Sequence, residues 1–334
     1  MSFSAATYRA CSFQAPAFPF DLDLLAAVRA RLATDRLGNN ETADLVHLLR
    51  QWGPQAAAAL PELYAVLPRF QYAATAITAV AAAGPQAERK QAGAALRAAA
   101  GSLMVAQAHH DLTGETDVLL DAVAKALAAG PREVAEAAQA AATLGVTAAG
   151  LLPALRAAVN EDAEPTTPQL DRDIAIATAL WQIDGDAEEA VTILASVLDR
   201  TTGNQVWYRW TVVRAIRATA LLGAAARPLI PRLEQLLADP EKAPAGALAL
   251  LAITDPDVVN LGQLAEAALH SAETGADISG ACEALQALST TALSTHQRLR
   301  VAELAKQDQR IVSSGVANNI IREDERLRAI LTAI

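Results

Sequence analysis

The sequence predicts an all-α chain built as a stack of antiparallel helix pairs, and three observations lead to this prediction. Apolar residues make up 52 % of the 334 residues, but aromatic residues only 4 %. The apolar mass is therefore mostly Ala, Leu and Val, and Ala has the highest helix propensity. Three stretches, 48–67, 140–159 and 212–240, can be laid on one another without gaps. Turn residues also recur about every 30 to 40 residues, a period typical of helical repeats.

The three stretches share a Gly and a Pro at a fixed spacing. Each Gly is followed eight residues later by a Pro, in the pairs Gly53/Pro61, Gly145/Pro153 and Gly223/Pro231. We expect the Gly to end the first helix in the left-handed conformation that favours this residue. Pro fits the first turn of the second helix, where its missing N–H is not needed. Each stretch is therefore predicted to form a helix, a tight turn and a second helix.

Residues 1–20 differ from the rest of the chain and are predicted to form an irregular, aromatic-rich N-terminal arm. They hold four of the five Phe residues, together with Tyr8 and two Pro. Three interpretations remain open. The arm folds back over the open end of the stack, it is a disordered leader, or it is a docking peptide for a partner.

Residues 21–334 are predicted to form a single array of about eight helix pairs. Turns between paired helices are expected at Gly53, Gly84-Pro85, Thr113-Gly114, Gly145, Gly185, Gly223 and Asp255-Pro256. Longer, Pro-bearing loops are expected near 160–168 and 239–245. A lone pair would leave an apolar stripe exposed, so each pair should be stabilised mainly by its neighbours.

Two motifs carry a resemblance to a known family. The LGxxA…LxPxLxxLL form of 222–237 and the ALWxIxGD form of 179–186 resemble bacterial HEAT-like repeats, of the armadillo/HEAT type. The resemblance covers roughly 21–290, and more weakly the rest. It implies a right-handed α-solenoid whose second helices line the concave binding side. Two groups of enzymes also have HEAT-like repeats, alkylpurine DNA glycosylases and bilin-chromophore lyases, so the resemblance is compatible with either activity.

Charge and composition restrict the location and the partners. The net charge of −10 argues against a nucleic-acid partner, because binding to phosphates needs a positive field on the protein. A local positive patch that binds nucleic acid remains an alternative. The two cysteines, Cys11 and Cys282, have no metal or disulfide spacing. No signal peptide precedes the helices, and no uncharged apolar run reaches the roughly 20 residues of a membrane span. We therefore expect a soluble, cytoplasmic protein without a membrane partner.

One segment stands out as a candidate partner-binding patch. Residues 204–232 carry five Arg and no acidic residue. If this segment is helical, its Trp and Arg side chains lie in a stripe along one side of the helix, where an indole ring and a guanidinium group can stack. The stripe predicts docking of an acidic peptide or stacking on a nucleic acid. Alternatively, the Trp rings pack on the preceding repeat and the Arg pair with neighbouring acids. The patch comprises Trp207, Trp210, Arg214, Arg217 and Arg232.

The remaining polar residues predict no catalytic or metal site and no cofactor. Adjacent residues such as His109 and His110 point about 100° apart on a helix, so they are not a zinc pair. His110 aligns with Trp181 and Leu251 in sister repeats, which favours a packing role. The sequence contains no GxSxG, HExxH or phosphate-binding loop.

The last helix keeps apolar residues at helical spacing to the end of the chain, with Ile330 and Ile334 among them. A capping repeat would be polar on its outer side. The pattern therefore predicts contact with a partner, self-association through this helix, or a regulatory module within a larger defence or signalling assembly.

The sequence as a whole favours a non-enzymatic scaffold that binds a protein or peptide. The alternatives are a DNA-binding or DNA-glycosylase-type HEAT-like protein, and a HEAT-like lyase.

Overall fold

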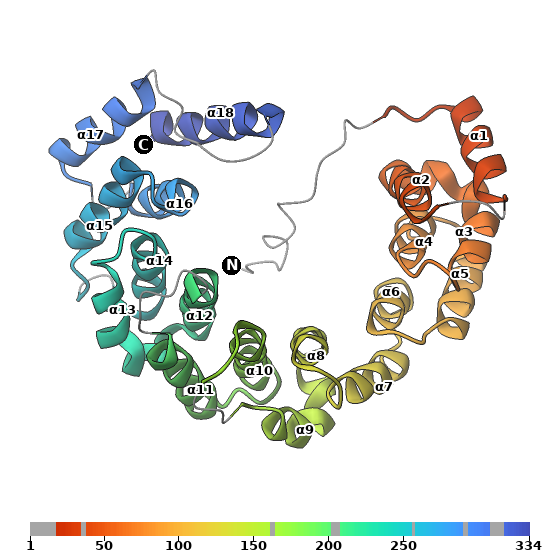
Figure 1. Cartoon of the computed structure of the whole chain (residues 1–334), viewed down its shortest axis with the longest axis horizontal. Helices are drawn as coiled ribbons and strands as arrows, with labels where there is room; N and C mark the ends of the chain where they lie inside the picture. Colours follow the sequence, from red (N-terminus) through yellow and green to blue (C-terminus); the bar gives the residue numbers. More distant parts are fainter. Residues whose placement is uncertain are drawn as a thin grey trace. The chain divides into compact units, whose positions relative to one another are not determined.

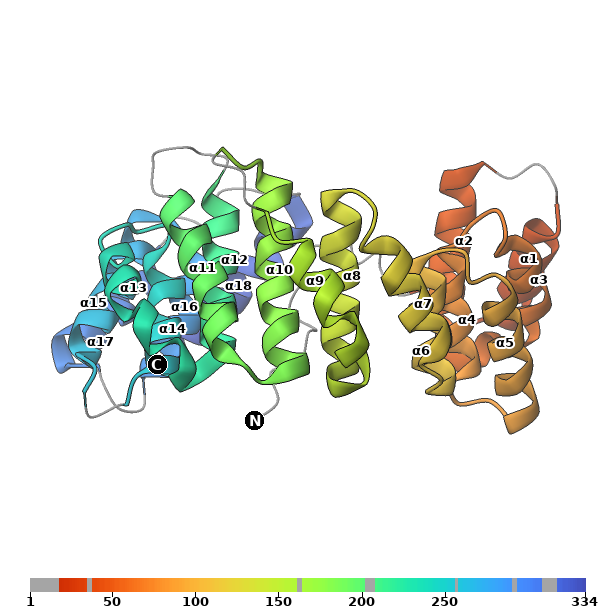
Figure 2. The same cartoon turned by 90° about the horizontal axis from the view of Figure 1, so that it is seen from below.

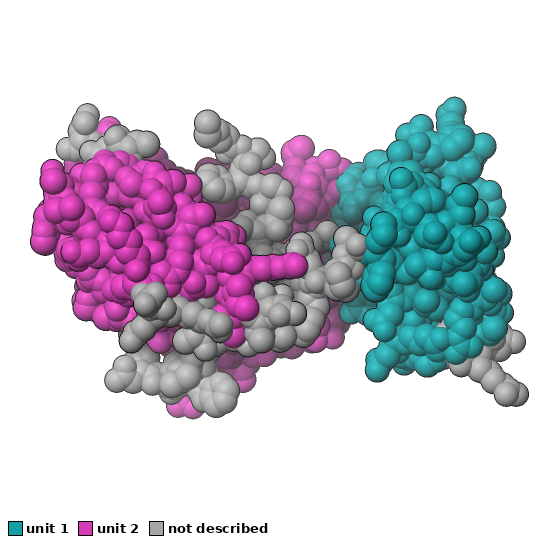
Figure 3. Space-filling model, turned by 90° about the horizontal axis from the view of Figure 1, so that it is seen from above, with its two compact units in different colours: residues 1–125 teal, residues 126–334 magenta. Residues whose placement is uncertain are grey.

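The computed structural model describes residues 18–34, 38–160, 164–201, 208–255, 258–289, 293–307 and 317–334. All regular structure within these ranges is helical and none is strand, which confirms the all-α prediction. The chain divides into two compact units, Met1–Lys125 and Ala126–Ile334, which are coloured separately in Figure 3. The predicted N-terminal arm lies outside the described residues except for Phe18–Phe20.

The described residues of unit 1 form seven α-helices, α1 to α7, and one seven-residue 3-10 helix (Figure 1). Helix α4 contacts α2, α3, α5 and α6, so it lies at the centre of the unit. The helices are α1 (Leu22–Leu32), α2 (Asn39–Trp52), η2 (Gly53–Ala59), α3 (Leu60–Val66), α4 (Ala73–Ala81), α5 (Gln86–Ala98), α6 (Leu103–Thr113) and α7 (Asp117–Ala126).

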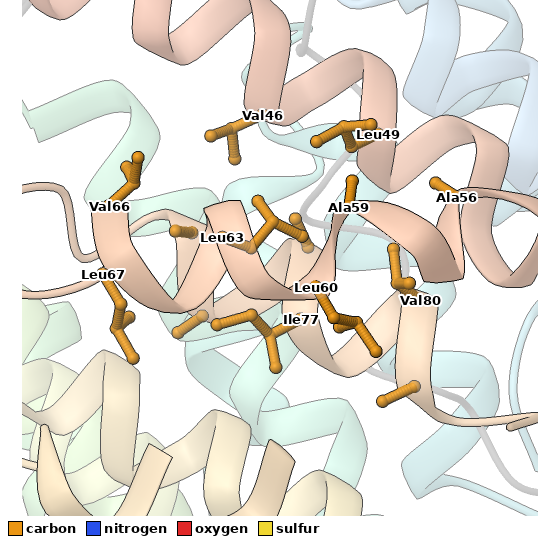
Figure 4. Close-up of a cluster of buried hydrophobic side chains, with 14 of the residues drawn as sticks. Val46, Leu49, Ala56, Ala59, Leu60, Leu63, Val66, Leu67, Ile77 and Val80 are labelled. Atoms are coloured by element: carbon orange, nitrogen blue, oxygen red, sulfur yellow. The ribbon is translucent and has the colours of Figure 1, made fainter. Parts of the chain in front are cut away.

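The core of unit 1 is made of small and branched aliphatic side chains. Figure 4 shows Leu49 of α2, Leu63 of α3 and Ile77 of α4 among the side chains of this cluster, and each is fully buried. The Ala residues of α4 allow close approach: Ala73, Ala74, Ala76 and Ala81 are all 0 % exposed. Burying apolar area at about 25 cal/mol per Å² is the main force that holds these short helices together.

Over its described residues, unit 2 contains α-helices α8 to α18 and two 3-10 helices, η3 and η5. They are α8 (Pro131–Leu144), η3 (Gly145–Leu151), α9 (Leu152–Ala157), α10 (Thr167–Asp184), α11 (Ala187–Arg200), α12 (Arg209–Leu222), η5 (Gly223–Leu229), α13 (Ile230–Leu236), α14 (Ala243–Ile253), α15 (Leu261–Thr274), α16 (Ile278–Leu288), α17 (Thr295–Lys306) and α18 (Ala317–Ala333). Helix α15 begins at Leu261, because the Asn260 side chain caps it by accepting from the Gln263 N–H at 3.1 Å.

Within unit 2, helices two apart in sequence pack side by side. Helix α10 contacts α8 and α12, α14 contacts α12 and α16, and α16 contacts α18. The helices between them pack on this row from one side, since α11 contacts α10 and α12 while α15 contacts α14, α16 and α17. Figures 1 and 2 show the two rows of this unit. Helix α14, which has no charged residue, is buried along most of its length.

The three aligned Gly–Pro stretches form the same backbone structure. In each, an α-helix ends at a Gly with positive φ, a seven-residue 3-10 helix follows, and a short α-helix then begins with Pro in its first turn. Our expectation of a left-handed Gly was wrong in detail. The φ/ψ pairs are 56/−130° at Gly53, 54/−137° at Gly145 and 56/−137° at Gly223. These angles mirror the polyproline II region, which only Gly enters readily.

A second type of turn occurs at Gly114, Gly185 and Gly275. There the φ/ψ pairs are 76/−2°, 75/1° and 70/19°, so these residues take the ordinary left-handed C-cap conformation. Both predicted long loops of unit 2 correspond to breaks between helices. One lies between α9 and α10, where 161–163 are outside the described residues, and the other lies between α13 and α14. Both are shorter at their ends than predicted, because α10 already begins at Thr167 and α14 at Ala243.

Among the described residues, one helical stretch, Pro131–Ala157, is long and apolar enough to cross a membrane by length and composition alone. It comprises α8, η3 and α9, and the positive φ of Gly145 separates α8 from the rest. Neither α-helix alone reaches the roughly 20 residues of a span. The stretch is therefore weak support for a membrane segment.

Candidate functional site

The candidate patch centres on α12 and its first turns. Helix α12 begins at Arg209, after Tyr208 as the N-cap residue, and Trp207 lies outside the described residues. The helix forms because Val212, Ala215, Ile216 and Thr219 recur at helical spacing on its buried face. The opposite face exposes Trp210, Arg217 and Leu221, at positions i, i+7 and i+11. We call these three residues the α12 stripe.

Trp210 is the most exposed large side chain of α12, at 62 %. The guanidinium carbon of Arg209, the preceding residue, lies 5.0 Å from the centroid of its ring system. Arg209 is fixed by two further contacts, because it pairs with Glu241 at 3.1 Å and donates to the Ala276 carbonyl at 2.8 Å. A cation held over one face of an exposed indole stabilises the ring by about 0.5–1 kcal/mol. The Trp210 ring is thus held in place while most of its surface faces solvent.

The two Arg residues of the patch that lie on α12 also contact acidic side chains. Arg214 donates to Asp171 Oδ2 at 2.6 Å, and the hydroxyl of Thr211 donates to Asp171 Oδ1 at 3.0 Å. Arg217 reaches Glu283 of α16 only at 4.0 Å, and both side chains are about half exposed. The excess of cations in the sequence is therefore balanced by acids from other helices.

Arg232 lies on α13 rather than on α12. Its Nε and Nη2 each donate to one carboxylate oxygen of Asp199 at 2.8 Å. This two-bond contact lowers the pKa of Asp199 and raises the pKa of Arg232. Of the cations in 208–232, Arg227 alone makes no ion pair with a described residue. The structure therefore groups Trp210, Arg214 and Arg217 on one helix, whereas Arg232 connects α13 to α11.

A buried acid that the sequence did not indicate lies on α10. Asp173 of α10 is fully buried; it accepts from the Asn160 N–H at 3.0 Å and from Arg200 at 3.0 Å, and Arg172 lies at 3.5 Å. Burial raises the pKa of this carboxyl, and the hydrogen bonds from Asn160 and Arg200 oppose the rise. The network joins α10, the end of α11 and the segment after α9. No sequence signal marks it, because its members are 13 and 27 residues apart.

The structure changes the interpretation of the His pair. His110 is half-buried, as are its aligned residues Trp181 and Leu251. The buried member is His109, at 1 % exposure, and desolvation lowers its pKa. Within the described residues, no group of three or more His, Cys, Asp or Glu side chains is arranged to hold a metal ion.

The two ends of the described chain are tied to their own units. The Trp52 indole N–H donates to the Phe18 carbonyl at 3.0 Å, and Phe20 packs edge-on against Trp52 at 5.5 Å. At the other end, Leu327 and Leu331 of α18 are buried, whereas Ile330 and Ile334 are half-buried. Helix α18 packs against α16 and α17 within unit 2.

Comparison with known proteins found no match to this chain among protein-family models, curated proteins or solved structures. The HEAT-like resemblance and the function therefore rest on the residues and the geometry described above.

Proposed function

We propose that the chain is a non-enzymatic scaffold of HEAT-like helix pairs, arranged as a right-handed α-solenoid, that binds a protein or peptide partner in the bacterial cytoplasm. Two features support the repeat assignment. Helices two apart pack side by side in each unit, as α2, α4 and α6 do in unit 1. The Gly–3-10–Pro structure also occurs three times with the same backbone angles.

The observation that carries the binding proposal is the α12 stripe. Trp210 is 62 % exposed and Leu221 is 49 % exposed, although the opposite face of α12 is buried. Exposed Trp and Arg residues are enriched among the residues that dominate binding energy at protein interfaces. At a rise of 1.5 Å per residue, Trp210 and Arg217 lie about 10 Å apart along the helix, and Leu221 lies about 6 Å further on.

This spacing indicates the chemistry of the partner. The open surface of the Trp210 ring and the Leu221 side chain each suit an apolar residue of the partner. Among the described residues, the ion-pair contact of Arg217 is the long one to Glu283, so an acidic residue of the partner can replace that weak pair at little cost. The stripe therefore fits a peptide segment that presents one acidic residue between two apolar residues.

A peptide-display selection on the full chain tests this proposal. We expect the enriched peptides to carry an acidic residue flanked by apolar ones. Their affinity should fall at least about tenfold for Trp210→Ala, which corresponds to roughly 1.4 kcal/mol. Arg217→Glu should weaken the same peptides, and Leu221→Ala should have a smaller effect. Because all three residues are exposed, these variants should keep the wild-type circular dichroism and melting temperature.

Arg132→Glu is the matched control, because Arg132 is an exposed Arg of unit 2 on α8 whose side chain is 84 % exposed. This variant should bind as wild type does. Peptides whose binding is unchanged by Trp210→Ala and Arg217→Glu would exclude the α12 stripe as the docking site. Binding of a DNA oligonucleotide at low salt that is lost in Arg217→Glu would favour the nucleic-acid alternative instead.

A further inference from the structure

His109 occupies a core position that sister helices fill with leucine. The segments 108–114, 179–185 and 249–255 can be aligned in sequence. In this alignment His109 of α6 corresponds to Leu180 of α10 and to Leu250 of α14. All three side chains are buried, each at 1 % exposure. An imidazole therefore takes the place of an aliphatic side chain in unit 1.

The surroundings of His109 suit only the neutral ring. Its Nδ1 is buried and has no hydrogen-bond partner among the described residues. Its Nε2 lies 3.5 Å from Glu115 Oε2, but that carboxylate also accepts from Arg97 at 2.9 Å. A protonated ring would direct its Nδ1–H into the core without an acceptor, and a buried charge without a hydrogen-bond partner is unfavourable.

The groups that face His109 do not compensate this cost. Helix α4, which packs against α6, has no titratable residue. Helix α5 contributes Arg97, α6 contributes His110, the turn after α6 contributes Glu115, and the first residue of α7 is Asp117. Desolvation lowers the pKa of His109; Glu115 and Asp117 act against this effect, whereas Arg97 and His110 add to it. The balance favours the neutral form.

The consequence for stability follows from proton linkage. In the unfolded chain His109 binds a proton near its ordinary pKa of about 6.5, whereas in the folded unit it does so only at lower pH. Unfolding therefore takes up a proton once the pH falls below about 6.5, and stability is lost over that window. We propose that His109 is an acid-sensitive element of unit 1: protonation of its imidazole at the buried Nδ1 loosens α6 from α4 and α5.

Hydrogen exchange of the full chain, followed by mass spectrometry, tests this inference. Exchange at pH 7.5 and at pH 5.5 is corrected for the intrinsic rate. Helix α14, which has Leu250 at the aligned position and no titratable residue, serves as the internal reference. We expect protection of α6 peptides to fall by up to about tenfold per pH unit below pH 6.5, the limit for one proton. Protection of α14 peptides should stay unchanged. In His109→Leu the loss in α6 should disappear, and in His270→Gln, an exposed His of α15, it should persist.

Two outcomes would overturn the inference. One is wild-type α6 protection that does not change relative to α14, and the other is a His109→Leu variant that keeps the wild-type loss of protection. A direct measurement remains if His109→Leu does not fold. NMR titration of the wild-type His109 ring should give a pKa below about 6.5, and a value at or above this figure would also contradict the proposal.

Discussion

The hairpin at Gly53 in unit 1 and the hairpin at Gly223 in unit 2 have the same backbone but opposite charges. Both glycines have φ of 56°, and each is followed by a seven-residue 3-10 helix and a short Pro-initiated α-helix. The residue after that Pro forms an ion pair with a residue 33 positions earlier in both. In unit 1 the pair is Arg29 with Glu62, and in unit 2 it is Asp199 with Arg232.

The comparison separates what the fold requires from what it tolerates. The Gly conformation and the apolar residue two places after each Pro recur unchanged, whereas the signs of the paired charges are exchanged. In the third copy, at Gly145, the residue after Pro153 is Ala154, which forms no ion pair. The backbone and the buried leucines therefore define the hairpin, and the surface pair is an interchangeable addition.

The largest effect is expected for the leucine two residues after the Pro. Leu63 and Leu233 are both 0 % exposed. Leu63→Ala and Leu233→Ala should each lower the unfolding free energy by about 2–5 kcal/mol, because each leaves a cavity in a packed core. Urea unfolding followed by circular dichroism measures this loss. A loss of unfolding free energy in only one of the two variants would show that the two hairpins are not equivalent.

A smaller effect is expected at the glycines, and it distinguishes the two types of turn. An added Cβ meets nothing within 4 Å at Gly223 or at Gly185, so the cost of substitution reflects backbone conformation alone. Gly223→Ala should cost about 3 kcal/mol, at the upper end for a Gly-only region, and Gly185→Ala about 1 kcal/mol. Thermal unfolding of both variants measures the difference.

Asparagine makes this test sharper, because Asn tolerates the left-handed conformation better than Ala does. Gly185→Asn should therefore recover part of the loss seen in Gly185→Ala. Gly223→Asn should recover none, since its mirror-image conformation excludes every side chain with a Cβ. Equal recovery at both positions would contradict the distinction between the two turns.

The sequence predicted the hairpins but not the details of these turns. Gly and Pro act locally, so their spacing was enough to place the end of one helix and the start of the next. The left-handed C-cap is the commonest helix end and was the natural expectation, whereas the mirror-image angles depend on the 3-10 helix that follows Gly53, Gly145 and Gly223. The fold class followed from composition and period, which are properties of the whole chain.

The candidate site was less predictable for a different reason. The sequence indicated an Arg-rich segment, but the acids that neutralise it come from distant positions, as in the contact of Arg214 with Asp171, 43 residues away. Periodicity also could not decide which of His109 and His110 is buried. Adjacent residues on a helix differ by about 100° in direction, so a displacement of one residue exchanges the core position for the surface.

The charge pairs provide the next, smaller test. Reversing the charge of one partner alone, by Arg29→Glu or by Glu62→Arg, should lower the unfolding free energy by at most about 1 kcal/mol, since both side chains are partly exposed. The double reversal Arg29→Glu with Glu62→Arg reproduces the polarity found in unit 2 and should restore most of this loss. A double-mutant cycle measured by urea unfolding gives the coupling energy. A double variant less stable than either single variant would mean that the polarity of the pair is fixed by other charges.

The smallest effect concerns the acid dependence of the unit 2 pair. The hydrogen bond from Arg232 lowers the pKa of Asp199 below its ordinary value, against a small opposing effect of burial. A carboxyl with a lowered folded pKa stabilises the fold above the unfolded pKa, near 3.9, and loses this contribution as the pH falls through its folded pKa. Asp199→Asn should therefore cost about 0.5 kcal/mol or less at pH 7, given the exposure of the pair. The difference from wild type should vanish in urea unfolding well below pH 3.9, and a difference that persists there would mean that Asp199 acts through packing and not through its charge.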